Sequence, residues 1–128
     1  MNNCICGSGE LFISCCEPLL KQKMLAKTPE QLMRSRFSAY ALGGFGGYLL
    51  STWFAPMAKG LTAEQLSAQS VRWESLEVLG SGVTGIQGWV EFKATCREGG
   101  KTHVLHEKSI FTLNADRWLY IGGEITPT

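Results

Sequence analysis

The sequence predicts an α+β domain in which short helices pack on one face of a curved, antiparallel sheet of four strands. Two observations predict this class. Helical patterns occupy residues 28–70, whereas residues 71–124 alternate apolar and polar positions between turn signals. A third observation, a cluster of cysteines in the first sixteen residues, sets a small segment ahead of the domain. We therefore divide the chain into a cysteine segment over residues 1–22 and a domain over residues 28–128.

Composition narrows the functions that the chain can have. It has 128 residues, of which 45% are hydrophobic, enough for one domain with a stable core. Twelve Lys and Arg stand against eleven Asp and Glu, and this balance argues against nucleic acid as a partner. The most apolar window, residues 41–50, is too short and too rich in glycine to span a membrane. Without a signal-peptide pattern we expect a cytoplasmic protein whose thiols stay reduced.

Capping signals define the predicted helices. Thr28 is a suitable N-cap with a proline directly after it, so a helix is predicted over residues 29–42. A second short helix is predicted over residues 48–54, and a third from the N-cap Thr62 to about Gln69. Pro18 is expected to stop any helix that begins at Cys15. The apolar face of the first of these helices comprises Leu32, Met33, Phe37, Tyr40 and Ala41.

Four strands are predicted in the second half of the chain. The second of them alternates cleanly, with Val90, Phe92 and Ala94 on the apolar face. The first alternates imperfectly, which indicates a bulge near Ser75. Helices laid over such a sheet would form a cone with one open end. The four strands are predicted over residues 71–79, 86–96, 103–113 and 118–121.

Four cysteines at the N-terminus have the character of a metal site. Cys4, Cys6, Cys15 and Cys16 crowd into sixteen residues, and a cluster of thiols in a reducing compartment indicates metal before disulfides. Zinc takes four such ligands at tetrahedral corners, and a closed shell of four thiolates is structural rather than catalytic. Disulfide pairing on oxidation is the alternative. Cys96 falls on an apolar strand face and is expected to be an inert core residue.

The cysteine segment resembles a known zinc-binding module. The residues that carry the likeness are Cys4-Ile5-Cys6-Gly7-Ser8-Gly9 and Cys15-Cys16, which resemble the SEC-C motif first described at the C-terminus of the SecA translocation motor. The resemblance implies that the four cysteines hold zinc and that the segment docks a protein partner. The loop from Glu10 to Ser14 carries no Lys or Arg, which argues against contact with anionic lipid or nucleic acid.

A second resemblance covers nearly the whole chain. It rests on residues 30–40, Thr52-Trp53, Trp73, residues 107–111 and 118–120, and Gly122. These residues resemble the YchJ family of uncharacterised bacterial proteins. The resemblance implies a nuclear-transport-factor-2-like domain, which is a cystatin-like cone, and agrees with the order of helices and strands predicted above. It implies no particular activity.

Charged residues on apolar faces suggest a polar feature inside the cone. Arg36 lies on the inward side of its helix beside Tyr40, and Glu107 shares a strand face with Leu105. Because either charge is costly to bury alone, we expect an Arg36–Glu107 pair, with Arg34 as the substitute partner. Ser109 lies two residues further along on the same strand face and is expected to join the network around this pair. The group is either the polar floor of a ligand pocket or a buried ion pair that fixes helix on sheet.

These features support two functions of different kinds. The first is a zinc-binding protein-interaction module, whose zinc segment stands off the domain and binds a protein partner. The second is a small-molecule-binding protein or an enzyme that uses the cone pocket. The sequence offers no evident pairing of nucleophile and base, which argues against an enzyme. A homodimer through the open sheet face is suggested only by analogy with other cone domains.

Overall fold

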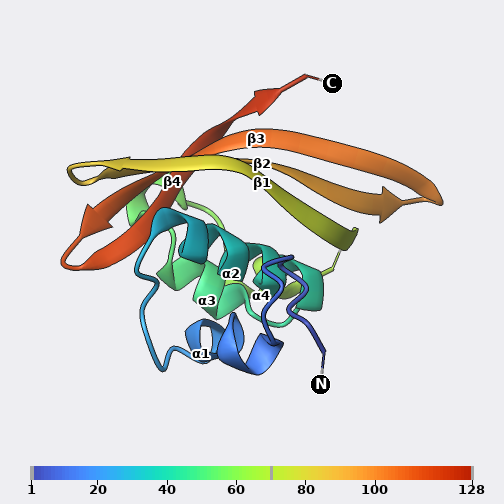
Figure 1. Ribbon diagram of the computed structural model, residues 1–128, viewed down its shortest axis with the longest axis horizontal. Coiled ribbons are helices and arrows are strands. Elements are labelled where there is room, and N and C mark those ends of the chain that lie inside the picture. Colours follow the sequence, from blue (N-terminus) through green and yellow to red (C-terminus); the bar gives the residue numbers. More distant parts are fainter. Residues whose placement is uncertain (1, 70, 128) are drawn as a thin grey trace.

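Alternation in the second half of the chain produces one antiparallel sheet, in the order β1-β2-β3-β4 (Figure 1). The computed structural model describes residues 2–69 and 71–127. Every strand is longer than the sequence predicted, because tight turns at Gly85, Gly99-Gly100 and Ala115-Asp116 let the pairing continue to the hairpin ends. The strands are β1 (Arg72–Thr84), β2 (Gln87–Glu98), β3 (Lys101–Asn114) and β4 (Arg117–Thr126).

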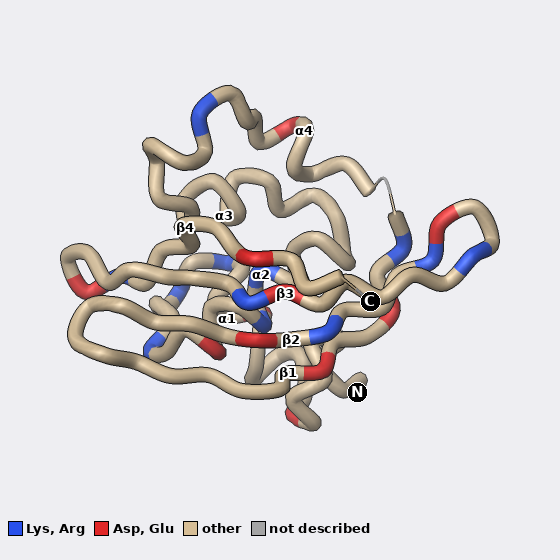
Figure 2. Tube along the Cα trace, turned by 90° about the horizontal axis from the view of Figure 1, so that it is seen from above, with Lys and Arg blue, Asp and Glu red and all other residues tan. Residues whose placement is uncertain are grey.

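The sheet is curved around the helices rather than flat. Register shifts occur in the β1–β2 pairing between Trp73 and Ser75 and between Val78 and Gly80, which confirms the predicted bulge. A further shift lies between Ile110 and Phe111 in the β3–β4 pairing. In Figure 2 the sheet is seen from above, with α1 and α2 behind it and with α3 and α4 extending past its edge at β4. The open side of this curve is where a cone pocket can form.

The main helix begins and ends where the sequence predicted. It is α2 (Pro29–Leu42), and the Thr28 hydroxyl accepts the Gln31 backbone N–H at 3.1 Å. Thr62 caps α4 through a full capping box. The remaining helical elements are α1 (Glu17–Leu20), α3 (Gly46–Ser51), α4 (Ala63–Ser67) and two short 3₁₀ turns, η1 (Phe12–Ser14) and η2 (Ala55–Met57).

Two predictions about helices are wrong. Pro18 does not stop a helix; it lies in the first turn of α1, where a missing backbone N–H costs nothing. The helix predicted over residues 48–54 begins earlier and ends earlier, as α3. Gly46 allows the earlier start, because its missing side chain lets the backbone lie directly against the carbonyl of Ala63, the first residue of α4.

The core lies between the helices and the inner face of the sheet. Leu32, Phe37 and Leu49 from the helices are almost fully buried. In Figure 1 the sheet lies above α2, α3 and α4, α1 lies below them, and the dark-blue N-terminal stretch rises to the level of α2. No helix among the described residues is long and apolar enough to span a membrane. The sheet contributes Leu76, Val90, Phe92, Ala94, Phe111 and Trp118 to the same core.

Candidate metal centre and cone pocket

The four predicted cysteines meet in space. Their Sγ atoms all lie within 4.8 Å of one another, and Cys15 Sγ is 3.6 Å from Cys6 Sγ and 3.9 Å from Cys16 Sγ. A tetrahedral ion with metal–sulfur bonds of about 2.3 Å needs sulfurs about 3.8 Å apart. The donor set and its spacing therefore fit a metal ion coordinated by four thiolates.

Local backbone structure assembles this cluster. Gly7 and Gly9 both have positive φ, +80° and +86°, and turn the chain back so that the Cys4 N–H donates to the Glu10 carbonyl at 2.7 Å. The turn η1 then leads to Cys15, and Cys16 is the N-cap of α1. The backbone thus brings the four Sγ atoms into one cluster, in which Cys6 is fully buried.

The thiols influence one another strongly. Hydrogen bonding, chiefly from Cys16 and also from Ser8, lowers the pKa of Cys6 to about 4. Burial raises the pKa of Cys15 to about 11, and the hydrogen bond to Cys6 together with burial raises the pKa of Cys16. Without a metal ion, ionisation is thus favoured at Cys6 and disfavoured at Cys15 and Cys16. A bound divalent cation would supply the positive charge that lets all four ionise.

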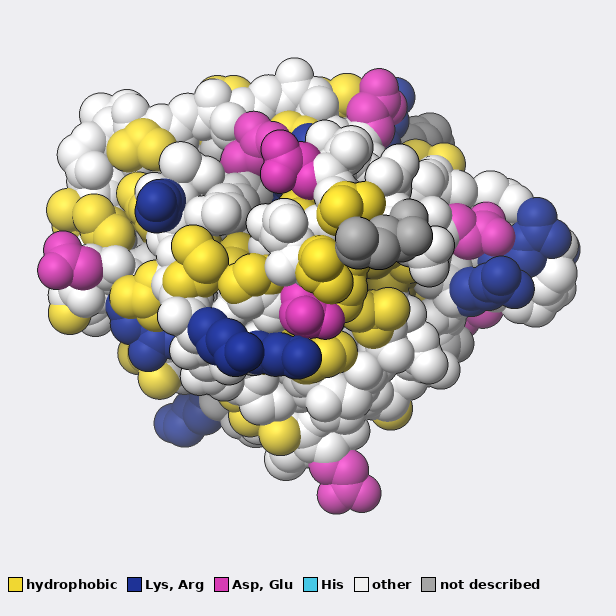
Figure 3. All heavy atoms as spheres, turned by 60° about the horizontal axis from the view of Figure 1, so that its bottom comes forward, with side chains coloured by type: hydrophobic (Ala, Val, Ile, Leu, Met, Phe, Trp, Pro, Cys, Tyr) yellow, Lys and Arg dark blue, Asp and Glu magenta, His cyan; other side chains and the backbone are white. Residues whose placement is uncertain are grey.

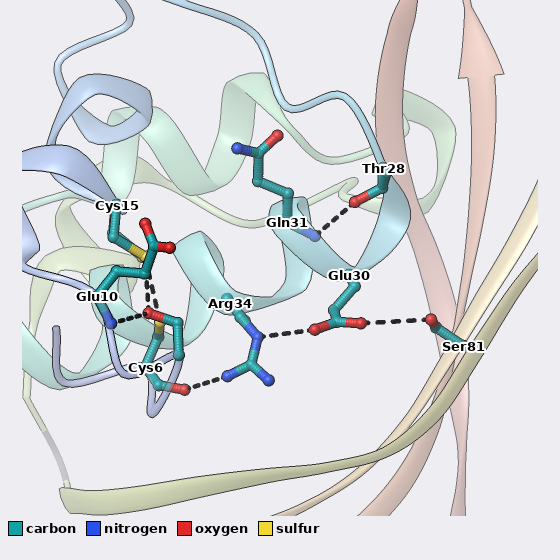
Figure 4. Close-up of polar contacts among 10 residues, drawn as sticks. Cys6, Glu10, Cys15, Thr28, Glu30, Gln31, Arg34 and Ser81 are labelled. Carbon is teal, nitrogen blue, oxygen red and sulfur yellow. Dashed lines mark hydrogen bonds and ion pairs between the residues drawn. The ribbon is translucent and has the colours of Figure 1, made fainter.

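The cysteine segment packs on the domain (Figure 4). Arg34 of α2 donates from Nη1 to the Cys6 carbonyl at 2.7 Å, and its Nε pairs with Glu30 at 3.0 Å. On the same helix, Ser38 Oγ lies 3.8 Å from Cys4 Sγ. The expectation that the segment stands off the domain is therefore wrong, because three of its cysteines belong to the main core. Arg34 is also no substitute partner for Glu107, since the Cys6 carbonyl and Glu30 engage it.

The second candidate site is a cavity of about 220 Å³ between α2 and the sheet. Arg36 and Tyr40 reach it from α2, and Glu107 and Ser109 reach it from β3, so all four residues predicted for the cone line one space. Most of its wall is apolar. The remaining lining residues are Met33, Phe37, Trp53, Trp73, Phe92, Ala94, Leu105, Phe111 and Tyr120.

Arg36 does not form the predicted ion pair with Glu107. Its guanidinium, only 5% exposed, donates from Nη1 to the Leu49 carbonyl at 2.8 Å and to Thr52 Oγ1 at 2.7 Å. Its Cζ lies 4.8 Å from the ring centroid of Trp53 and 4.7 Å from that of Tyr120. The carbonyl near the end of α3 and two aromatic rings thus hold the cation in place of a carboxylate.

Glu107 has partners of its own. Its Oε2 accepts from Ser109 Oγ at 2.5 Å and from the Tyr120 hydroxyl at 3.3 Å, so Ser109 joins Glu107 but not a pair with Arg36. Gly123, paired with Ser109 across β3 and β4, leaves the space into which the Glu107 carboxylate fits. Burial and the nearby Glu107 charge raise the pKa of Tyr120, and burial raises the pKa of Tyr40.

Sequence reasoning missed three residues around the Arg36 guanidinium, two of which line the pocket. Thr52, Trp53 and Tyr120 hold or cover the Arg36 guanidinium, yet none was proposed as a site residue. Strand alternation was a usable signal for Tyr120, which follows the inward-facing Trp118 by two positions. No comparable signal existed for Thr52 and Trp53, because they lie just after α3 and reach Arg36 only through the tertiary fold.

Comparison with known proteins agrees with this architecture. The family model described as "YchJ, middle NTF2-like domain" matches residues 28–123. A UPF0225 protein of Chromobacterium violaceum is 40% identical over 123 residues, covering 94% of this chain and 90% of that protein.

Solved structures show the same fold. The solution structure of a SEC-C motif containing protein from Rhodopseudomonas palustris is 38% identical and superposes with a TM-score of 0.90, covering 98% of this chain and all of that one. The crystal structure of a SEC-C motif containing protein from Psychrobacter arcticus has a TM-score of 0.80 at 24% identity, covering 98% and 83% of the two chains. The second likeness concerns the fold alone.

Proposed function

The chain belongs to the YchJ family of bacterial proteins, and we propose that it binds a small molecule in the cone pocket while a zinc ion fixes its N-terminal segment. The observation that carries this proposal is the cavity itself. It is largely apolar, it lies between preformed elements, and charged and hydroxyl groups converge on it from α2 and β3. Such a combination of apolar walls and a few placed polar groups is typical of ligand sites.

The size of the cavity supports this function over a purely structural role. An apolar protein cavity of roughly 150 Å³ is large enough to bind benzene. The cone pocket, at about 220 Å³, is larger, and it contains Arg36 and Glu107 without an ion pair between them. A structural ion pair would have joined the two charges and closed the space. The pocket is suited to a compound of one ring with substituents.

A fragment screen on the native protein tests the pocket directly. Ligand-observed NMR identifies small compounds that bind, and Ala94→Leu should abolish their binding because Ala94 lines the cavity. Thr95→Leu is the matched control, since the next residue of β2 points to the other face of the sheet. Fragments that bind Ala94→Leu as well as native protein, or a screen without binders, would refute the proposal.

Zinc is proposed for the cysteine cluster on chemical grounds. Four thiolates suit zinc, and a shell that they close has no position for a substrate. The ion would therefore hold residues of the N-terminal segment against α2. Elemental analysis of protein purified under reducing conditions should find one zinc per chain. Cys16→Ser should lower that content strongly, whereas Cys96→Ser should leave it unchanged, because Cys96 lies on β2 away from the cluster.

A protein-docking role for the cysteine segment stays a second prediction. Ile13, between the two pairs of cysteines, is 52% exposed, which favours contact with a partner. Figure 3 shows the lower side of the molecule, where hydrophobic side chains form a broken band among charged ones. Pull-down from a bacterial lysate with native protein and with Ile13→Asp tests this role. The prediction fails if every captured protein is also retained by the Ile13→Asp variant.

A further inference from the structure

We infer that the ligand of the cone pocket is a small aromatic carboxylate that also carries a hydrogen-bond donor, with its carboxylate on Arg36 and its donor on Glu107. This inference rests on the proposed function and adds the chemical class of the ligand. It follows from which polar atoms in the pocket are already engaged and which are not.

Arg36 presents an unused edge to the pocket. A guanidinium has five N–H donors, and the structure engages those of Nη1 with the Leu49 carbonyl and Thr52. The Tyr40 hydroxyl also interacts with the guanidinium. Among the described residues, however, Nε and Nη2 reach no carbonyl or carboxylate oxygen, and no carboxylate forms an ion pair with Arg36. These two nitrogens form the edge of the group that binds a carboxylate through two parallel hydrogen bonds. A cation 5% exposed without a counter-ion favours an anionic ligand.

The same wall contains a second donor without an acceptor. The indole Nε1 of Trp53 is buried and has no hydrogen-bond partner, and the Trp53 ring lies beside the Arg36 guanidinium. Buried polar groups are nearly always hydrogen-bonded in folded proteins. Trp53 Nε1 is itself covered, so Arg36 is the donor that a ligand can reach on this wall, and an oxygen acceptor on the ligand would complement it.

The opposite wall of the pocket has an acceptor oxygen without a donor. Glu107 uses Oε2 for Ser109 and Tyr120, whereas its Oε1 has no partner among the described residues. A ligand hydroxyl or amino group can donate to that oxygen. A second carboxylate cannot bind there without repulsion, so Glu107 also orients the ligand with its acid toward Arg36. The two charged residues reach the pocket from α2 and β3, respectively.

The walls between these two residues select an aromatic body. Phe37, Trp73, Phe92 and Phe111 surround the cavity, and ring edges and faces pack well against another ring. The volume admits one ring with a substituent at each end rather than a fused or extended system.

The test uses native protein and a matched set of probes, namely benzoate, benzamide, benzamidinium and 4-hydroxybenzoate, titrated by two-dimensional NMR. Benzoate should bind about 10-fold to 100-fold more tightly than its neutral isostere benzamide, the range expected for a paired carboxylate. The hydroxyl of 4-hydroxybenzoate should strengthen binding further, and Glu107→Gln should reduce that gain. Arg36→Lys, which keeps the charge and loses the paired edge, should reduce the preference for benzoate over benzamide.

The outcomes separate this inference from the proposed function. Benzamide or benzamidinium binding as tightly as benzoate would overturn the carboxylate assignment and leave the pocket a ligand site. The carboxylate assignment is also overturned if none of the four probes binds but other fragments bind native protein and not the Ala94→Leu variant. The pocket then remains a ligand site. If no fragment of any class binds, both proposals fall. Because the probe comparison is made on native protein, it does not depend on the folding of any variant.

Discussion

Two glycines of the cysteine segment allow a direct test of whether the segment is fixed to the sheet. Gly7 and Gly9 have similar positive φ values, +80° and +86°, but their surroundings differ. A Cβ on Gly7 would lie 2.8 Å from the Leu76 carbonyl oxygen of β1, whereas a Cβ on Gly9 would meet nothing within 4 Å. Alanine at either position must adopt a left-handed backbone, but only alanine at Gly7 must also displace the loop from the sheet.

The expected magnitudes follow from these two effects. Left-handed backbone costs an L-residue about 1–2 kcal/mol, so Gly9→Ala should lower the free energy of unfolding by that amount. Overpacking against a rigid neighbour adds about 1–3 kcal/mol, so Gly7→Ala should lower it by about 2–5 kcal/mol. The neighbour is strand backbone, which cannot rotate away as a side chain would, and the larger effect is therefore expected at Gly7.

Urea denaturation of the metal-loaded proteins, followed by tryptophan fluorescence, measures these differences. Gly60→Ala is the control for backbone strain alone, since Gly60 has a φ of +89° and open surroundings far from the cysteines in the sequence. Release of metal to a chromogenic chelator should also be faster for Gly7→Ala than for Gly9→Ala. Equal losses of stability in the two variants would show that the segment does not lie against β1 as described.

Three further substitutions test the packing that positions the pocket. Gly46→Ala should destabilise the protein by about 1–3 kcal/mol, because its Cβ would overlap the Ala63 carbonyl. Gly47→Ala, which has open surroundings in the same helix, should instead stabilise the protein by about 0.5–1 kcal/mol. Urea denaturation of both variants checks these opposite signs. Tyr48→Phe should cost about 1 kcal/mol, because it removes the buried hydroxyl that lies 2.6 Å from Ser35 Oγ, and a thermal melt showing an unchanged midpoint would contradict this.

Features encoded by local sequence were predictable. The bounds of α2 follow from a threonine cap, a proline at the first position and a glycine after the last, all within a few residues of the helix ends. The inward faces of β2 and β3 follow from alternation, which placed Glu107 and Ser109 correctly in the cone. The cysteine cluster follows from thiol spacing and two glycines. Each of these signals lies in residues that are close to one another in the sequence.

Contacts that depend on the path of the chain were not predictable. The partner of Arg36 depends on where α3 ends, and that helix was predicted over different residues, so the Leu49 carbonyl and Thr52 were not considered as acceptors. The predicted ion pair with Glu107 followed from the correct rule that buried charge needs a partner. It failed because carbonyl oxygen and aromatic rings supplied that partner instead.

The position of α2 between the metal centre and the pocket leads to a final prediction. Arg34 and Ser38 contact the cysteine segment, while Arg36 and Tyr40, on the same four turns, line the pocket. If metal binding holds α2 in place, removing the metal should weaken a pocket ligand, and the ligand should slow metal loss by the same coupling free energy.

The coupling should be measurable in both directions. We expect chelation of the metal to weaken binding of a validated pocket fragment by about fivefold or more, the lower end of typical coupling between two sites. Titration of the fragment into metal-loaded and chelated protein gives one side of the cycle, and metal affinity with and without the fragment gives the other. Chelated protein that keeps its helical circular dichroism and binds the fragment with unchanged affinity would show that α2 is fixed by the sheet and α3 alone. A metal ion bound by the four cysteines would then stabilise only the N-terminal segment, and the pocket would be independent of it.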